Sequence, residues 1–374
     1  MHDVAIYTAS SATAGFYDRS HGRAGGAERQ MTLLARALVE RGYRVAHVIY
    51  PPREPVSLAY PLTLVHRAPY AGGRRIVGAL LEAVAVWRAL RRADARVVVV
   101  RTASPLVGVV ALFCKRHGRR MVFSASNVSD LTLETMAGRR NRALYRFGVS
   151  RAAAVVVQSD DQRVLALRDF PSLRRVVAIP SFAEMQPAAE TDRTGETFLW
   201  FGRSVRQKRP HHYVELARAL PEARFRMIPV PQRATAGTDE GLRAAERELP
   251  NLEILDPLPH AQLAELVGRA VAVVNTSTLE GMPNAFLEAW ASGVPVLTLE
   301  FDPDGIVQRH GLGVSARGSW EAFVEGARDL WRSRADRQEL SRRVRSYVEA
   351  AHSYEAVASR WAALIDEVEG ARPR

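Results

Sequence analysis

Short apolar runs alternate with longer amphipathic stretches along the first half of this 374-residue chain. Apolar runs of the length of buried strands lie at 4–8, 44–50, 97–100, 121–123, 154–157 and 176–179. Between them, apolar residues recur with helical spacing at 27–41, 75–92, 106–117 and 139–150. Repetition of strand and helix in this order predicts βαβ units in a parallel, doubly wound sheet.

The alternation stops at 180–194, a polar segment with prolines that predicts an interdomain linker at 183–196. It then restarts, with strands expected at 197–201, 224–228, 252–254, 271–275 and 294–298 and helices expected at 210–220, 239–249, 261–268 and 284–292. From residue 319 the pattern is helical to the end, at 319–334, 336–350 and 354–369.

The expected fold is therefore α/β, with two facing Rossmann-like domains and a C-terminal helical tail. We place the first domain at 1–182 and the second at 197–353, and we expect the helix at 354–374 to pack back on the first domain. Ligands of such sheets bind at the carboxyl ends of the strands, which predicts a site in the cleft between the domains.

Composition narrows the setting. The single cysteine, Cys114, excludes an internal disulfide framework, and its apolar surroundings predict a buried structural thiol. No basic segment followed by a long apolar core opens the sequence, so we expect no signal peptide. The longest apolar run, 105–114, is far shorter than the ~20 residues that span a bilayer. We expect a cytoplasmic protein, with any membrane contact peripheral and on the inner face.

The net charge of +12 is unevenly distributed, at +16 over residues 1–182 and −4 over 183–374. A basic half suits nucleic acid, an anionic membrane surface or an anionic substrate. We expect no nucleic-acid partner, because the aromatic stacking motifs of RNA-binding modules are absent. An anionic, lipid-linked acceptor would meet the clusters Arg74-Arg75, Arg88 with Arg91-Arg92, and Arg119-Arg120. The alternative is a compositional bias toward arginine.

The most informative segment is 275–296, NTSTLEGMPNAFLEAWASGVPV. A strand is expected to end at Asn275 and a helix to begin near Asn284. Backbone amides at the start of a helix, together with the helix dipole, favour an anion there. Gly281 lets a ligand approach the backbone closely. The predicted anion site is formed by Gly281, Met282, Pro283 and Asn284.

Two carboxylates, Glu280 and Glu288, flank this helix start. Carboxylates accept hydrogen bonds from neighbouring hydroxyls, so the segment suits a polyhydroxyl ligand that carries phosphates. For either residue alone, an acidic partner of the helix dipole is the simpler explanation.

A second candidate site follows the strand at 197–201. Arg203 and Lys208 precede the helix expected at 210–220, and Lys208 is one of only two lysines in the chain. An ammonium group and a guanidinium group both suit a diphosphate. The alternative is a solvated basic loop, for which Arg206 and Arg209 are the better candidates.

A third candidate lies at Gly25-Gly26, which open the first helix after the long segment 8–26. Two glycines before a helix are weak evidence by themselves. The length of the segment and its small residues are typical of a closing loop.

The segment 275–296 resembles the motif of the retaining family-4 glycosyltransferases, also called glycosyl transferase group 1. In that motif two glutamates are separated by seven residues; the first opens EGMPN and the second opens EA-x-A-SG-x-PV. The resemblance implies a GT-B fold, a donor nucleotide-sugar on the C-terminal domain and an acceptor on the N-terminal one. It also implies that Glu288 binds the donor ribose, that Glu280 contacts the transferred sugar, and that Arg203 and Lys208 neutralise the leaving diphosphate. Gly25 and Gly26 match a loop that closes over the donor.

The chain departs from that family at one point. Many members carry a His-Asp pair after a central N-terminal strand, where this sequence has Ser126-Asn127 with Asp130 nearby. Serine and asparagine bind sugar hydroxyls but are not bases at neutral pH.

We therefore expect a retaining hexosyl- or N-acetylhexosaminyl-transferase of cell-surface polysaccharide or glycolipid assembly. The alternatives are a nucleotide-sugar-binding protein without activity and a GT-B epimerase or hydrolase. We expect no metal or cofactor, because Arg203 and Lys208 supply the cations, and we interpret the pair Asp302 and Asp304 as a turn.

Overall fold

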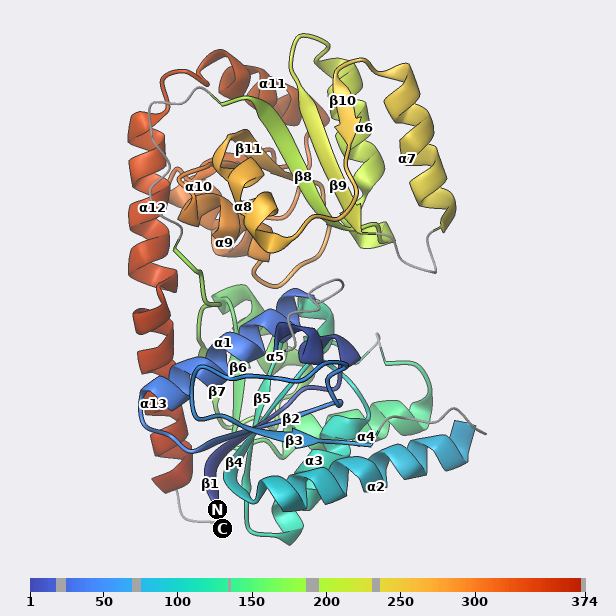
Figure 1. Cartoon of the computed structure of the whole chain (residues 1–374), viewed down its shortest axis with the longest axis vertical. Helices are drawn as coiled ribbons and strands as arrows, with labels where there is room; N and C mark the ends of the chain where they lie inside the picture. The colour runs from blue at the N-terminus through green and yellow to red at the C-terminus, as the bar shows by residue number, and fades with distance from the viewer. Residues whose placement is uncertain (18–24, 69–74, 134–135, 186–194, 231–235, 371–374) are drawn as a thin grey trace. The chain divides into compact units, whose positions relative to one another are not determined.

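The computed structural model describes residues 1–17, 25–68, 75–133, 136–185, 195–230 and 236–370. The chain forms two compact units (Figure 1). Unit 1 comprises Met1–Phe182 and Tyr354–Arg374, and unit 2 comprises Ala183–Ser353. Each unit contains one parallel sheet with helices on both faces, which confirms the predicted pair of Rossmann-like domains.

The sheet of unit 1 has the strand order β3-β2-β1-β4-β5-β6-β7, and all its pairings are parallel. The strands are β1 (His2–Tyr7), β2 (Val45–Ile49), β3 (Thr63–His66), β4 (Ala95–Arg101), β5 (Arg120–Ser124), β6 (Ala154–Val157) and β7 (Val176–Ala178). The central strands are apolar on both faces because helices cover both sides of a parallel sheet.

Two helical layers enclose this sheet. One face carries α2 (Arg75–Ala93), α3 (Leu106–Arg116), α4 (Arg139–Ser150) and α5 (Asp160–Asp169). The other face carries α1 (Gly26–Glu40) and α13 (Tyr354–Gly370). The last helix belongs to unit 1 because it buries Trp361, Leu364 and Ile365 in the same core as α1. Cys114 is buried, and burial raises the pKa of its thiol to about 12.

The sheet of unit 2 has the order β10-β9-β8-β11-β12-β13 and is also parallel. Its strands are β8 (Thr197–Arg203), β9 (Phe225–Val230), β10 (Leu252–Ile254), β11 (Ala270–Asn275), β12 (Val296–Thr298) and β13 (Gly313–Ser315). Its helices are α6 (Pro210–Ala219), α7 (Ala236–Glu248), α8 (His260–Gly268), α9 (Asn284–Ala291), α10 (Ile306–Arg309), α11 (Trp320–Arg332) and α12 (Gln338–His352). Of the expected linker 183–196, residues 186–194 lie outside the described residues, and Ala183 packs into the core of unit 2.

Each sheet has a position where the strand order reverses. In unit 1 this switch point lies between β1 and β4, and in unit 2 it lies between β8 and β11. The loops that follow two such strands diverge to opposite faces of the sheet and leave a crevice at their carboxyl ends, where ligands of this fold bind. The candidate residues are therefore best judged at these two positions.

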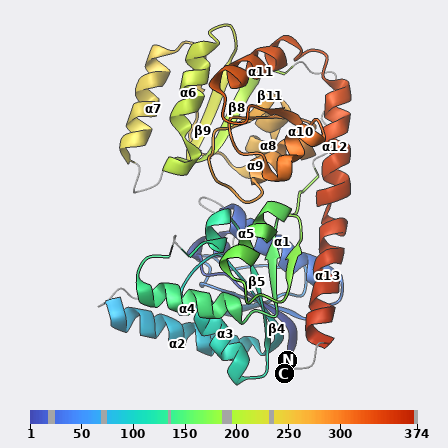
Figure 2. The same ribbon diagram turned by 180° about the vertical axis from the view of Figure 1, so that it is seen from behind.

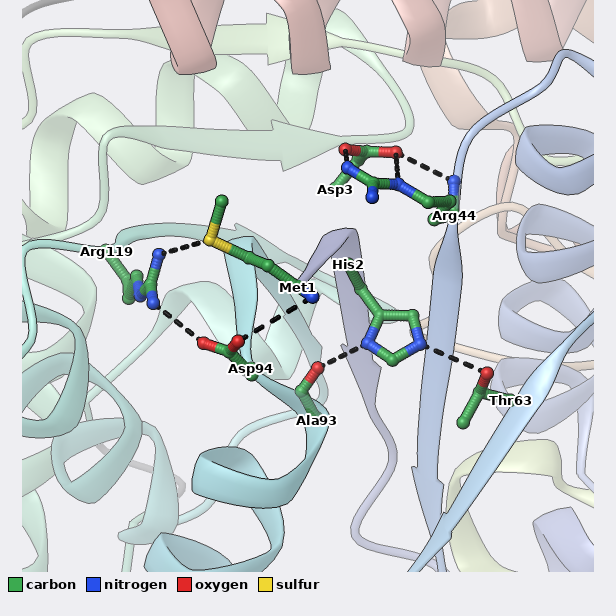
Figure 3. Close-up of polar contacts among 8 residues, drawn as sticks. All are labelled: Met1, His2, Asp3, Arg44, Thr63, Ala93, Asp94 and Arg119. Atoms are coloured by element: carbon green, nitrogen blue, oxygen red, sulfur yellow. Dashed lines mark hydrogen bonds and ion pairs between the residues drawn. The ribbon is translucent and has the colours of Figure 1, made fainter.

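At the amino ends of the strands of the unit 1 sheet, polar contacts join neighbouring segments (Figure 3). The residues involved are Met1, His2, Asp3, Arg44, Thr63, Ala93, Asp94 and Arg119. Arg119 donates to Asp94 at 2.8 Å, so this arginine of the expected basic cluster already has a counterion. The hydrogen bond from Arg44 holds the pKa of Asp3 below its usual value. Among the described helices, none has the length and apolarity to cross a bilayer.

Candidate functional site at the two switch points

In unit 2, hydrogen bonds join the loop after β8 to the loop after β11. Thr276 donates from Oγ1 to the carbonyl oxygen of Lys208 at 2.6 Å and accepts from Nε1 of the buried Trp200 at 3.1 Å. The amide of Thr278 donates to the carbonyl of Gln207 at 3.1 Å. Two segments that are about 70 residues apart in sequence are thereby held side by side.

This joining brings Lys208 and Glu280 together as an ion pair between Nζ and Oε1. The hydroxyl of Ser277 donates to the same Oε1 at 2.7 Å, and Asn275 Oδ1 accepts from the amide of Ser277. The side chains of Lys208 and Glu280 are 17% and 11% exposed, so the pair lies where water screens charge incompletely. The two residues were predicted separately from sequence, and the structure places them in one site.

Arg203 ends β8 with an exposed side chain that forms no ion pair with any described residue. Gly202, just before it, has a φ of 147°, a conformation that favours glycine. The interpretation of Arg209 as a solvated residue is wrong. Its Nε donates to the carbonyl of Thr276 and its Nη2 to Glu300, each at 2.8 Å, so Arg209 is a structural cross-link. Arg206 is exposed, as expected.

Helix α9 begins at Asn284, as the sequence predicted. Gly281, Met282 and Pro283 are buried, and the Met282 side chain belongs to the core of unit 2. The less buried residues of α9 are Asn284, Ala285 and Glu288, which share one helical face. Glu288 therefore lies on the accessible face of this helix.

In unit 1, the glycine pair lies at the start of α1. Gly25 is the N-cap residue and Gly26 is the first helical residue. A Cβ atom at Gly25 would lie 2.6 Å from Oε2 of Glu28, so the glycine leaves room for that carboxylate. Of the expected mobile segment 8–26, residues 18–24 lie outside the described residues.

A buried histidine anchors the start of the same segment. His47, on β2, is hydrogen-bonded through Nε2 to Thr8 at 2.9 Å and through Nδ1 to the hydroxyl of Tyr17 at 2.6 Å. Its imidazole is fully buried, and this burial lowers its pKa to about 3. The sequence did not single out His47, which falls within an apolar strand.

Ser126 and Asn127 lie in the loop after β5, and the buried Asp130 organises that loop. Asp130 Oδ2 accepts from the amide of Ser126 at 2.7 Å, from its hydroxyl at 2.6 Å and from the amide of Asn127 at 3.2 Å, while Oδ1 accepts from Ala103 N at 3.1 Å. Asn127 Oδ1 accepts from Ser129 N and caps a short 3-10 turn. Asp130 thus holds the loop in place through four accepted hydrogen bonds.

Arg101 is a further buried group that sequence reasoning missed. It ends β4, is 6% exposed and donates from Nη1 to Ser124 Oγ at 2.8 Å. Its Nε has no hydrogen-bond partner among the described residues, and burial lowers the pKa of the guanidinium to about 10. One arginine at a strand end gives no distinctive signal in a chain so rich in arginine.

The Asp302 and Asp304 turn has the predicted local role. Asp302 Oδ1 accepts from the amide of Val307 at 2.9 Å and Oδ2 accepts from that of Gln308 at 3.3 Å, at the start of α10. Asp304 has a φ of 51°, which is a turn conformation. Within the described parts of the chain, no group of three or more candidate metal ligands is found.

Comparison with known proteins gives a consistent picture. A family model described as "Glycosyl transferase 4-like domain" matches residues 25–181. A second, "Glycosyl transferases group 1", matches residues 181–347. The two matches meet next to the boundary between units 1 and 2.

Solved structures share the fold at low sequence identity. Sucrose-phosphate synthase from Thermosynechococcus elongatus is 15% identical with a TM-score of 0.78, covering 98% of this chain and 99% of that one. Anabaena HepE in complex with UDP and glucose is 13% identical with a TM-score of 0.72, covering 98% and 100%. AviGT4, a glycosyltransferase involved in avilamycin A biosynthesis, is 17% identical with a TM-score of 0.62, covering 99% of each chain. With both domain matches in sequence order on this fold, the chain is a GT-B glycosyltransferase.

Proposed function

We propose that this glycosyltransferase moves a hexosyl or N-acetylhexosaminyl group from a nucleoside-diphosphate donor to an acceptor hydroxyl, with retention of anomeric configuration. The observation that carries the proposal is the Lys208–Glu280 ion pair at the switch point of unit 2, with Arg203 at the end of the neighbouring strand. Cations that are already in position cost no reorganisation when charge develops on a leaving diphosphate.

The donor is assigned to unit 2. Lys208 and Arg203 bind the diphosphate, and the backbone of Gly281–Asn284 adds amide donors at the start of α9. Glu288, on the accessible face of α9, accepts hydrogen bonds from the ribose hydroxyls. Uridine nucleotides are the first choice for testing, since the similar Anabaena HepE is described in complex with UDP-glucose.

The reaction needs no protein base. The acceptor oxygen attacks the anomeric carbon on the face from which the diphosphate departs, so the new carbon–oxygen bond forms as the bond to phosphate breaks. The acceptor proton passes to an oxygen of the leaving phosphate. Glu280 holds Lys208 through Oε1 and contacts the sugar hydroxyls through Oε2, so its role is positioning. The saturated Asp130 agrees with such a mechanism.

The acceptor is assigned to unit 1, beside Ser126 and Asn127, whereas Gly25 and Gly26 are assigned to the loop that closes over the donor. The strongly basic first half of the chain supports an anionic, lipid-linked acceptor, as used in assembly of cell-surface polysaccharides or glycolipids. A metal is not part of the proposal, because the chain supplies its own cations at the diphosphate. Activity that survives exhaustive treatment with EDTA would support this point, and activity that is restored only by a divalent ion would contradict it.

The test begins with thermal unfolding in the presence of UDP-, GDP- and ADP-sugars, followed by donor turnover for each that stabilises the protein. One nucleotide class is expected to raise Tm, and Glu288→Gln is expected to abolish the shift, whereas the control Glu265→Gln on the exposed side of α8 retains it. Proton NMR of the product then gives the anomeric configuration. An inverted product would contradict the proposed mechanism.

The alternatives predict different products. An epimerase or hydrolase of this fold would consume the donor without an acceptor. A nucleotide-sugar-binding protein is favoured by the absence of the His-Asp pair and would show the thermal shift with no turnover under any acceptor condition.

A further inference from the structure

Helix α2 presents an apolar stripe to solvent. Val77, Leu80, Leu81 and Val84 are 53%, 65%, 58% and 38% exposed. Their spacing of three, four and seven residues places them on one face of the helix. The opposite face packs into the core of unit 1 through Val86, Ala89, Leu90 and Ala93. The fold therefore already uses a different face of α2, and the stripe contributes nothing to the core.

The helix that carries the stripe is firmly held. Glu82 forms an ion pair at 2.9 Å with the buried Arg67, which in turn donates to the hydroxyl of Tyr7 at 2.7 Å. Trp87 packs edge-on against Phe113 of α3, with ring centroids 5.2 Å apart. The exposed leucines thus belong to a helix with fixed tertiary contacts and do not result from a frayed end.

The stripe continues into positive charge. Arg88 and Arg91 follow Val84 by four and seven residues, on the same helical face, and both are exposed. The neighbouring α3 repeats the pattern, with Leu112 exposed and then Lys115 and Arg116.

Further basic residues lie on α4, whose exposed side chains are Arg139, Arg140, Arg142 and Arg146. Both views of the molecule show α2, α3 and α4 along one face of unit 1 (Figures 1 and 2), and α3 packs against both of its neighbours. The sequences of these three helices contain one acidic residue, Glu82, which Arg67 already neutralises. We call this face the α2–α4 surface. Apolar side chains within a field of arginines suit an anionic lipid surface, where alkyl groups and phosphates occur together.

Helix α5 provides the contrast. Val164 and Leu167 are also exposed apolar residues. Their helix carries Asp160, Asp161 and Asp169, which balance its arginines, and Asp160 pairs with Arg163. Exposed apolar side chains therefore occur with a positive field on α2 and without one on α5.

We infer that the α2–α4 surface docks on an anionic bilayer, with the α2 stripe at the boundary between headgroups and acyl chains and the arginines on the lipid phosphates. Docking would bring the enzyme to the membrane that holds the proposed lipid-linked acceptor, and in that respect the inference rests on the proposed function. Lipid binding is nevertheless measured without donor or acceptor, so failure of docking and failure of transfer are distinguishable.

The experiment is co-sedimentation of the full chain with vesicles of phosphatidylglycerol and phosphatidylcholine, and with vesicles of phosphatidylcholine alone. Binding is expected only with the anionic vesicles and is expected to weaken with added salt. The double substitution Leu80→Ser and Leu81→Ser is expected to lower the partition coefficient about tenfold. Its matched control, Val164→Ser and Leu167→Ser on α5, is expected to leave it unchanged.

The charge contribution has its own variant, Arg88→Gln with Arg91→Gln, expected to lower binding roughly 25-fold at low salt, about fivefold for each arginine. Thermal unfolding of every variant checks that the fold is intact. Equal binding to neutral vesicles, or equal losses in the α2 and α5 variants, would overturn the inference. So would the absence of lipid binding together with a dimer, seen by light scattering, that the α2 serines dissociate, because the stripe would then be a contact between two copies.

Discussion

The two switch points of this chain have the same topology but differ in how far their charged groups are exposed. In unit 2, Lys208 and Glu280 form an ion pair between the loops that follow β8 and β11, and the exposed Arg203 ends β8. In unit 1, the charged groups Asp130 and Arg101 are buried; Asp130 holds the loop after β5, and Arg101 donates to Ser124 at the end of that strand. In the proposed function the unit 2 site presents charge to the donor, whereas Asp130 in unit 1 shapes the loop that carries Ser126 and Asn127.

This difference agrees with the division of labour in the proposed reaction. The diphosphate of a nucleotide-sugar carries two negative charges and gains a third as the sugar–oxygen bond breaks, so the proposed reaction needs cations in unit 2. An acceptor hydroxyl that delivers its proton to the departing phosphate needs only hydrogen-bonding groups, and Ser126 and Asn127 provide them. The carboxylate of Asp130 is engaged by the hydroxyl of Ser126 and by the backbone of the same loop.

The largest effect is expected from Lys208→Ala. Loss of a cation positioned on the leaving group should lower kcat about 100- to 1000-fold, measured by release of nucleoside diphosphate. The free energy of unfolding should also fall, because the nearly buried Glu280 loses its counterion, so kcat is measured at temperatures where the variant is folded. Arg206→Ala, in the same 3-10 turn but exposed, is the control and should retain near-normal turnover. A Lys208→Ala protein with unchanged kcat would remove unit 2's charge from the mechanism.

How far the sequence predicts these sites depends on the range of the interactions. The motif at 275–296 places the end of β11 and the start of α9 correctly, because both are set by local apolar and turn residues. The pairing of Lys208 with Glu280 is a tertiary interaction. It depends on hydrogen bonds of Thr276 with Lys208 and Trp200, which join the loops after neighbouring strands, and no local sequence pattern predicts it.

The short edge strands β3 and β13 were not predicted from the sequence, for a related reason. β3 and β13 have partly exposed side chains and no apolar run, so periodicity does not reveal them. In β13 the signal is Gly313, where a Cβ atom would lie 1.9 Å from the carbonyl oxygen of Val296. A lone glycine has that meaning only once the neighbouring strand is known. Arg209 was misjudged on the same ground, since its partner Glu300 is 91 residues away.

The second effect tests the buried charge of unit 1. Asp130→Asn removes the charge and turns an NH₂ group toward donors, so it should lower the free energy of unfolding by about 3 kcal/mol, measured by urea denaturation. Affinity for UDP or another donor nucleotide, which we assign to unit 2, should persist at temperatures where the variant is folded. A stable Asp130→Asn protein that had lost turnover would instead point to a catalytic carboxylate and break the comparison.

A smaller effect concerns the pH dependence of stability. Burial disfavours the imidazolium and lowers the pKa of His47 to about 3 in the folded protein, against 6.5 for an imidazole exposed to water in the unfolded chain. The unfolded chain therefore binds the proton first as the pH falls below 6.5, and stability is lost in the window from 6.5 down to 3. Between pH 7 and pH 5 this histidine alone should cost about 2 kcal/mol.

Denaturation curves at several pH values test this expectation. The His47→Gln protein should lose that part of the pH dependence. Thr8→Val, which removes one hydrogen bond but keeps the imidazole, should be less stable at every pH with an unchanged slope. Parallel curves for His47→Gln and the unsubstituted protein would show that the imidazole has the same pKa in the folded and the unfolded chain.

The smallest effect distinguishes a structural role of the Ser126 hydroxyl from a role in binding the acceptor. Its hydroxyl donates to Asp130 at 2.6 Å, and its amide donates to the same oxygen at 2.7 Å. Ser126→Ala removes the first bond and leaves the second, so Asp130 stays satisfied and the cost to stability should be about 1 kcal/mol. If the hydroxyl acts only as scaffold, KM for the acceptor and kcat should both change by less than about threefold. A rise in acceptor KM of about tenfold, with unchanged kcat and donor affinity, would show that the Ser126 hydroxyl also binds acceptor in the ground state. The buried charge would then be organising a recognition surface in unit 1, as the ion pair organises one in unit 2.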